Sequence, residues 1–164
     1  MAITRITNAG INDVLESISR LAGDGIRSAE VRQLALTITS NKPDEIAAIF
    51  DWVKENVRYT PDPIIGDGIE LFISPIRQVK NYHEGKEMAE DCDGMAILCS
   101  SLLSSIGYRT RVAIMATGGQ DYDHAICQVF SEKLNDWVNV DPSNEDFPLG
   151  WEIQYSKIIY AEPV

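Results

Sequence analysis

The stretch from Asp91 to Gly107 constrains the fold more than any other part of this chain. Its apolar residues recur at helical spacing, and Gly107 supplies the left-handed turn that commonly ends a helix. The recurring positions are Met95, Leu98, Cys99, Leu102, Leu103 and Ile106. Cys92 precedes this repeat, in the first predicted turn, where unpaired backbone N–H groups and the positive dipole end favour a negatively charged sulfur. The pattern therefore predicts a central helix at 91–107 that carries a candidate nucleophile at its N-terminus.

Length and composition predict one soluble domain, residues 1–164, which can bury about 70% of its unfolded surface without disulfides. A net charge of −11 without a cluster of Lys or Arg argues against nucleic acid or an anionic membrane as the main partner. The three cysteines show no disulfide spacing, and the N-terminus lacks the apolar core of a signal peptide. We expect a cytoplasmic protein, or a virion-associated one if a phage encodes it; the sequence leaves the oligomeric state open.

The rest of the sequence divides into three parts. Residues 1–58 carry the apolar stripes of three helices: one closed by a turn at Gly23–Gly25, one over Ser28–Thr39 and one starting near Pro43. Residues 59–90 are rich in proline and glycine and predict a long loop that walls one side of a cleft, with one short element at Ile69–Ile73. Residues 108–164 alternate as strands do; the strands are expected at 108–115, 125–130, 137–140 and 153–160. The prediction is an α+β fold, with N-terminal helices and a central Cys-bearing helix packed on an antiparallel β-sheet.

His124 and Asp141 are predicted to share one face of that sheet. If the second and third strands form a hairpin, Phe130 faces Trp137, directly or after a slide of two residues. In either register Asp141 lies across from His124 or on its diagonal, within reach of the imidazole. A slip of one residue would place them on opposite faces. Cys92, His124 and Asp141 thus predict a nucleophile, its base and the group that orients the base.

The other cysteines and the second histidine have simpler predicted roles. Cys99 lies on the packed stripe of the helix and Cys127 on an apolar strand face, so both are expected to be buried core thiols. His83 is expected in a solvated loop. A metal site built from Cys92, His124 and Asp93 or His83 is an alternative, but the short paired spacing of zinc ligands is absent. No metal and no cofactor is predicted.

Asp91 and Asp93 flank the candidate nucleophile. We expect them to cap the helix, although they could also guard the mouth of a cleft. Their negative charges raise the pKa of the Cys92 thiol, whereas the helix end and His124 lower it, and the sequence leaves the balance open.

These residues suggest a reaction in which the Cys92 sulfur attacks an amide or peptide carbonyl. His124 takes the thiol proton, Asp141 stabilises the imidazolium, and the backbone N–H of Cys92 helps to hold the oxyanion. The resulting thioester passes to water or to an amine.

Several segments resemble, in order and spacing, the transglutaminase-like branch of the papain-related cysteine enzymes, above all its compact bacterial and phage-borne members. They span roughly Ile46–Ser143: Asp51–Tyr59, Asp91–Asp93, Leu102–Gly107 with Arg111–Val112, Asp123–Ala125 and Trp137–Ser143. The resemblance implies the papain-like fold, with Cys92 as nucleophile, His124 as base and Asp141 as third member. The family includes protein cross-linkers, proteases, amidases and members without catalysis. It therefore implies either an acyl-transfer enzyme acting on a protein or peptide substrate, as hydrolase or transglutaminase, or a non-catalytic structural or assembly protein that keeps the fold.

Overall fold

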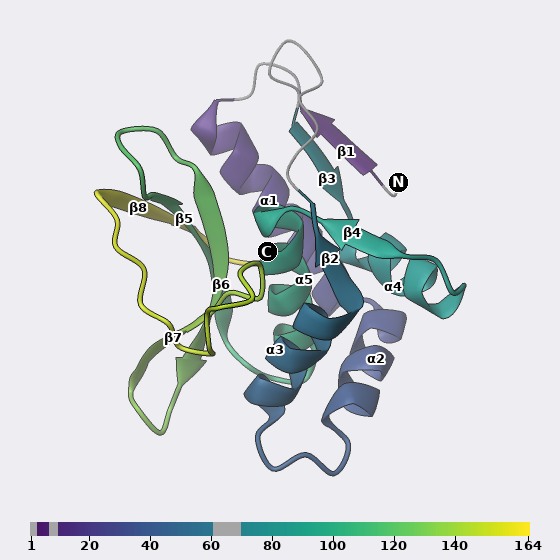
Figure 1. The fold of residues 1–164 in the computed structure, drawn as a ribbon. Helices are drawn as coiled ribbons and strands as arrows, with labels where there is room; N and C mark the ends of the chain where they lie inside the picture. The colour runs from purple at the N-terminus through teal and green to yellow at the C-terminus, as the bar shows by residue number, and fades with distance from the viewer. Residues whose placement is uncertain (1–2, 7–9, 61–69) are drawn as a thin grey trace.

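The computed structural model describes residues 3–6, 10–60 and 70–164. Its helices gather on one side of a larger sheet (Figure 1). The elements are β1 (Ile3–Ile6), α1 (Ile11–Ile26), α2 (Ala29–Thr39), α3 (Glu45–Asn56), β2 (Val57–Tyr59), β3 (Glu70–Ile73), α4 (Pro75–His83), β4 (Met88–Glu90), α5 (Cys92–Ser105), β5 (Thr110–Ala116), β6 (His124–Ser131), β7 (Asp136–Val140) and β8 (Lys157–Ala161). This arrangement confirms the predicted α+β fold.

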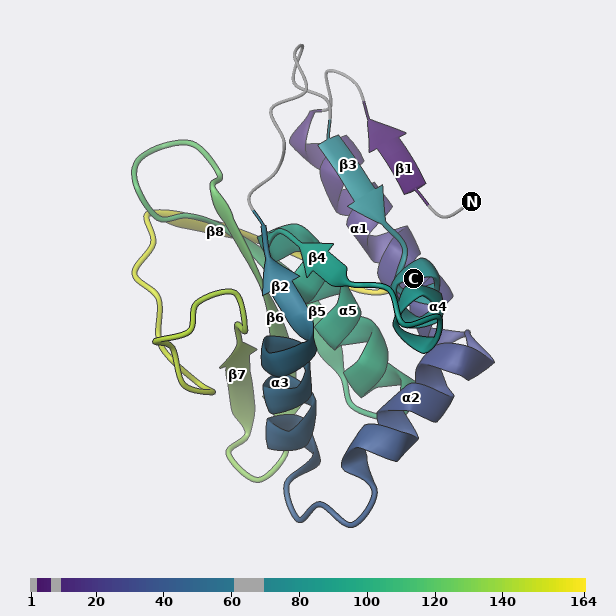
Figure 2. The ribbon, with the colours of Figure 1, turned by 45° about the vertical axis from the view of Figure 1, so that its right-hand side comes forward.

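The largest sheet has four antiparallel strands in the order β7-β6-β5-β8. One face of it is apolar, and α5 lies against that face (Figure 2). The buried residues of this face include Val112, Ile114, Ala125, Cys127, Val129 and Val140. The predicted packing of the central helix on an antiparallel sheet is therefore confirmed.

The helix α5 is buried on nearly all sides. Its residues from Gly94 to Leu103 are all buried, because α1, α2, α3 and α4 pack around it while β6 covers its remaining side. A helix that is buried all round forms the centre of a domain. Among the described residues, no helix combines the length and the apolar character that a membrane crossing requires.

The turn predicted at Gly23–Gly25 was wrong, because α1 continues through both glycines to Ile26. A Cβ atom at Gly23 would overlap the backbone of Val164, and one at Gly25 would overlap the side chain of Ser101 on α5. The two glycines therefore permit close packing of α1. The third helix starts at Glu45 instead of Pro43, with Asp44 accepting the N–H of Ala47 at 3.0 Å as its cap.

The predicted loop at 59–90 was also wrong for its described part. It contains β3, the helix α4 and β4, while residues 61–69 lie outside the described residues. The Ser74 hydroxyl accepts the N–H of Arg77 at 3.2 Å, and Pro75 occupies the first helical turn, so a Ser-Pro start signalled this helix. The predicted short element at Ile69–Ile73 corresponds to β3, which pairs with β1.

Two strands fall within the first 59 residues, which were predicted to be helical up to residue 58. They are β1 and β2, and β2 pairs with β4 in parallel. The strand predicted at 153–160 begins later, at Lys157. The hairpin register of β6 and β7 is the predicted one, with Phe130 paired to Trp137 and Gln128 to Asn139.

Candidate active site

Cys92 is the first residue of α5, and its neighbours explain why the helix starts there. Asp91 has an extended backbone, and its Oδ1 accepts the N–H of Gly94 at 2.9 Å, which confirms the predicted capping role of Asp91. A Cβ atom at Gly94 would overlap the carboxylate of Glu90, so the glycine lets this carboxylate lie against the first turn of α5. The thiol is half-buried, and the N–H of Cys92 belongs to the first turn, where no acceptor exists within the helix.

His124 and Asp141 are joined by a hydrogen bond at the end of the sheet. His124 is the first residue of β6, and Asp141 directly follows β7, so the register places them on a diagonal of the same face. The Nε2 of His124 lies 2.8 Å from Oδ2 of Asp141. The imidazole is 21% exposed and the carboxylate only 4%, so this contact is shielded from water. The predicted pairing of these two residues is present in the structure.

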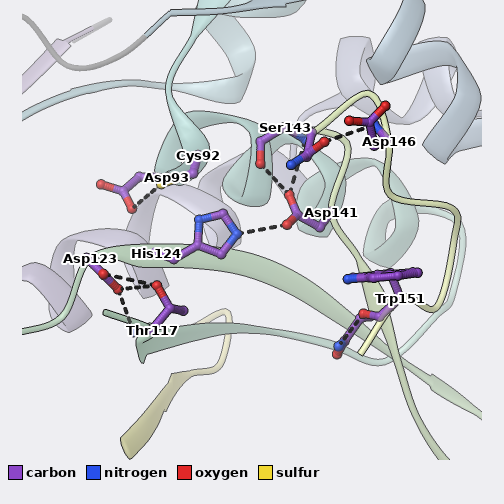
Figure 3. A network of polar contacts seen from close by, with 11 residues as sticks. Cys92, Asp93, Thr117, Asp123, His124, Asp141, Ser143, Asp146 and Trp151 are labelled. Atoms are coloured by element: carbon purple, nitrogen blue, oxygen red, sulfur yellow. Dashed lines mark hydrogen bonds and ion pairs between the residues drawn. The ribbon is translucent and has the colours of Figure 1, made fainter. Parts of the chain in front are cut away.

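The imidazole lies between the thiol and the carboxylate (Figure 3). Nε2 faces Asp141, and the second ring nitrogen lies on the side of Cys92. If the neutral ring gives its Nε2 proton to Asp141, Nδ1 carries the lone pair that a base needs. The sulfur also accepts the backbone N–H of Ala125, the next residue along β6, which ties the start of α5 to the start of the strand.

Burial raises the pKa of the Cys92 thiol far above its ordinary value. The negative charge of Asp93 adds to this effect, and Asp91 and Asp141 add further, whereas the hydrogen bond from Ala125 lowers the pKa. The sequence left open whether the effects that raise the pKa of Cys92 outweigh those that lower it. In the structure the raising effects are larger, so the neutral thiol is favoured. Its hydrogen is directed at Oδ1 of Asp93, with 3.8 Å between sulfur and oxygen.

The pKa of His124 is also raised, although burial by itself lowers it. The hydrogen bond and the charge of Asp141 outweigh the burial, and the charges of Asp123 and Asp93 act in the same direction. The site therefore holds a neutral thiol beside an imidazole that loses its proton only above the ordinary histidine pKa of 6.5.

Ser143 was missed at the level of the sequence, although it closes the Asp-Pro-Ser segment after β7. Its hydroxyl donates to Oδ1 of Asp141 at 2.6 Å, and its backbone N–H donates to the same oxygen at 3.1 Å. Both oxygens of this buried carboxylate are thus hydrogen-bonded, one to Ser143 and the other to His124. Serine two residues after an aspartate is typical of an Asx turn, which could have indicated this contact.

The remaining candidate residues lie away from this site. Cys99 and Cys127 are fully buried, as predicted. His83 is exposed, as predicted, but it ends the helix α4 instead of lying in a loop. Within the described residues, no group of three or more His, Cys, Asp or Glu side chains is arranged to hold a metal ion.

A pocket of about 510 Å³ lies beside Ser143, and its lining includes neither Cys92 nor His124. Met95 of α5 and Ser143 contribute to its walls, and so do Tyr59 and Met88, from the two ends of the segment predicted to wall a cleft.

A cysteine at the start of a buried helix, beside a histidine–aspartate pair on an antiparallel sheet, defines the class of papain-like folds. Within this class the chain belongs to the transglutaminase-like superfamily, whose family model matches residues 31–142. No curated protein sequence matches the chain.

Solved structures of bacterial proteins share the fold. A Cytophaga hutchinsonii protein provisionally assigned as a cysteine protease is 16% identical with a TM-score of 0.55, over 87% of this chain and 49% of that one. LapG of Legionella pneumophila is 17% identical with a TM-score of 0.53, over 90% of this chain and 84% of LapG. A Parabacteroides distasonis protein provisionally assigned as a protease is 13% identical with a TM-score of 0.50, over 82% of this chain and 30% of that one. The chain thus spans about half of the first protein and less of the third.

Proposed function

We propose that this protein is a cysteine-dependent acyl-transfer enzyme that acts on amide carbonyls of a protein or peptide, through a thioester on Cys92. The observation that carries the proposal is the imidazole of His124, which is held by Asp141 through one ring nitrogen and has its other ring nitrogen on the side of Cys92. A nucleophile, a base and a group that fixes the base are the components of thiol-dependent acyl transfer.

The neutral thiol determines how the first step proceeds. As the sulfur approaches the carbonyl carbon, its proton moves to Nδ1 of His124, and the imidazolium that forms is stabilised by Asp141. In this proposal the N–H of Cys92, at the positive end of α5, donates to the developing oxyanion. The imidazolium then protonates the leaving amine, and the thioester remains.

The second step reverses these roles. His124 removes a proton from water or from an amine, which attacks the thioester and releases Cys92. Water gives hydrolysis, and an amine gives a transglutaminase-type product.

The test is the rate of alkylation by iodoacetamide between pH 4 and 10, measured by mass spectrometry at each cysteine of the native protein. We expect modification at Cys92, and protection of Cys99 and Cys127 because both are fully buried. If His124 serves as base, His124→Ala slows the reaction of Cys92 by about tenfold or more.

His83→Ala is the matched control, because His83 is the only other histidine of the chain and is exposed on α4. This variant is expected to react like the wild type. If Cys92 reacts at equal rates in the wild type and in His124→Ala across the whole pH range, the proposed acyl-transfer activity is refuted. A non-catalytic structural or assembly role then remains as the function. Incubation of the active protein with casein and a biotinylated primary amine then separates hydrolysis, seen as fragments, from transfer, seen as labelled casein.

A further inference from the structure

The loop between β5 and β6 leads directly to the candidate base. It spans residues 117–123, and His124 follows it as the first residue of β6. Gly118 and Gly119 lie side by side in this loop, and by themselves they would allow it many backbone conformations. The imidazole lies between the thiol and the carboxylate of the site, so the position of the first residue of β6 decides whether it can serve both (Figure 3).

The carboxylate of Asp123 closes this loop by binding its first two residues. Oδ1 accepts the backbone N–H of Thr117 at 2.7 Å, and Oδ2 accepts the N–H of Gly118 at 3.1 Å (Figure 3). The hydroxyl of Thr117 lies 2.9 and 3.0 Å from the two oxygens. The backbone N–H of Asp123 donates to the carbonyl of Met115 at 2.9 Å, and Met115 is the residue that pairs with His124 in the sheet. Asp123 is therefore tied to the start of the loop and to β5 at once.

The same loop is also held from the other side, by the residue that precedes β8. The N–H of Ser156 donates to the carbonyl of Ala116 at 2.9 Å, and its hydroxyl donates to the carbonyl of Gly119 at 2.7 Å. The loop is thus anchored to the sheet at its middle, and Asp123 connects His124 to an anchored partner. A hydrogen bond can position a residue only when its other end is itself held in place.

A carboxylate suits these contacts better than an amide does. The hydrogen bonds, led by the one from the Thr117 backbone, lower the pKa of Asp123, so the group is ionised at neutral pH and both oxygens accept. An amide has a single acceptor oxygen, and its NH2 group would face a backbone N–H. Asp123→Asn therefore breaks part of the contact although the side chain keeps its shape.

We propose that Asp123 is a positioning residue, whose carboxylate fixes the loop 117–123 and thereby holds the imidazole of His124 between Cys92 and Asp141. This inference rests on the proposed function and adds to it a residue that acts through the base. Without the contact the start of β6 adopts several positions, and the imidazole spends less time where it can take the thiol proton. Small displacements of a catalytic group lower reaction rates strongly.

The first test is a double-mutant cycle on the rate at which iodoacetamide alkylates Cys92 at neutral pH. We expect Asp123→Asn to slow this reaction about threefold or more when His124 is present. In the His124→Ala background the same change should have an effect below about 1.5-fold, because a residue that acts through the base has nothing left to position. Asp121→Asn removes an exposed carboxylate from the same loop and is the matched control, with an unchanged rate.

The second test follows the imidazole directly, by an NMR titration of the ring protons of the chain's two histidines. Thr117→Val removes the hydroxyl that contacts Asp123 and changes no charge. The pKa of His124, which the contact with Asp141 raises, should fall in this variant because the ring is held less firmly against that carboxylate. Thr117→Ser keeps the hydroxyl and should keep the wild-type titration, and the exposed His83 is the internal reference.

The positioning role is overturned if Asp123→Asn slows Cys92 equally with and without His124, or if Thr117→Val leaves the titration of His124 unchanged. Both substituted side chains are exposed, and if one variant does not fold, the other decides the matter. Failure of the proposed function looks different: His124→Ala then alkylates as fast as the wild type. The NMR titration needs no reaction at Cys92, so it still reports on the position of the imidazole.

Discussion

The hydroxyl of Ser143 should be a measurable part of the candidate site, because it holds the carboxylate that holds His124. Asp141 is 4% exposed, and Oδ1 of this carboxylate accepts the hydroxyl at 2.6 Å. Ser143→Ala removes this hydrogen bond and leaves the backbone N–H, at 3.1 Å, as the donor from Ser143 to that oxygen. Hydrogen bonds to charged groups contribute about 1.5–3 kcal/mol, and a buried carboxylate that loses one cannot regain it from bulk water.

We therefore expect Ser143→Ala to lose about 1.5–3 kcal/mol of unfolding free energy in urea denaturation. For a chain of 164 residues this loss corresponds to a Tm lower by about 3–12 °C in calorimetry. The rate of Cys92 acylation should fall as well, because Asp141 can then rotate away from the imidazole. Ser143→Thr keeps the hydroxyl and serves as the control.

A double-mutant cycle with Asp141→Asn isolates the contact between the two side chains. We expect a coupling energy of about 1 kcal/mol or more, since hydrogen-bonded neighbours do not act independently. A loss below about 0.5 kcal/mol in Ser143→Ala, or strictly additive losses in the cycle, would refute this reasoning.

Two more predictions follow from the geometry. The pH profile of kcat/KM should rise with pH above 6.5, because His124 acts only after it loses its proton and its pKa is raised. The carboxylate of Asp141 raises the pKa of His124 by more than burial lowers it, so Asp141→Asn should lower this pKa and shift the rise of the profile to lower pH. An unshifted or higher midpoint would contradict the assignment of His124 as base. Gly25→Ala should lower the unfolding free energy in urea by about 1–2 kcal/mol. The overlap of the new Cβ with Ser101 destabilises the fold by more than the higher helix propensity of alanine stabilises it. Gly119→Ala, where a Cβ meets nothing within 4 Å, should stay within about 0.5 kcal/mol, and equal stabilities of the two variants would show that α1 does not need the close approach.

Local patterns predicted those parts of the protein whose side chains repeat with the period of their element. The apolar repeat after Cys92 and the positive φ of 104° at Gly107 mark α5 and its end, because both follow from the geometry of one helix. The diagonal of His124 and Asp141 follows from strand alternation once Phe130 faces Trp137. The resemblance to the transglutaminase-like family rested on several sequence segments that occur in the family's order. The match of the family model to residues 31–142 supports this resemblance.

Local sequence patterns could not predict contacts between segments that are distant along the chain. Gly23 and Gly25 have the composition of a turn, and only the partners Val164 and Ser101 show that they are packing positions. The helix α4 was missed because proline and glycine around it suggested a loop, although its Ser-Pro start carried the local signal.

By itself, the sequence determined which helix bears Cys92 and which strand face bears His124 and Asp141. The tertiary structure alone decided the ionisation of the thiol. The sequence showed the charges of Asp91 and Asp93 but not the burial, which is the largest cause of the raised pKa of Cys92. Burial is a property of everything packed around an atom, and for this sulfur those neighbours include Ala125, more than thirty residues away along the chain. A helix end provides the same dipole in any protein, but the layers packed around it determine whether its cysteine is charged.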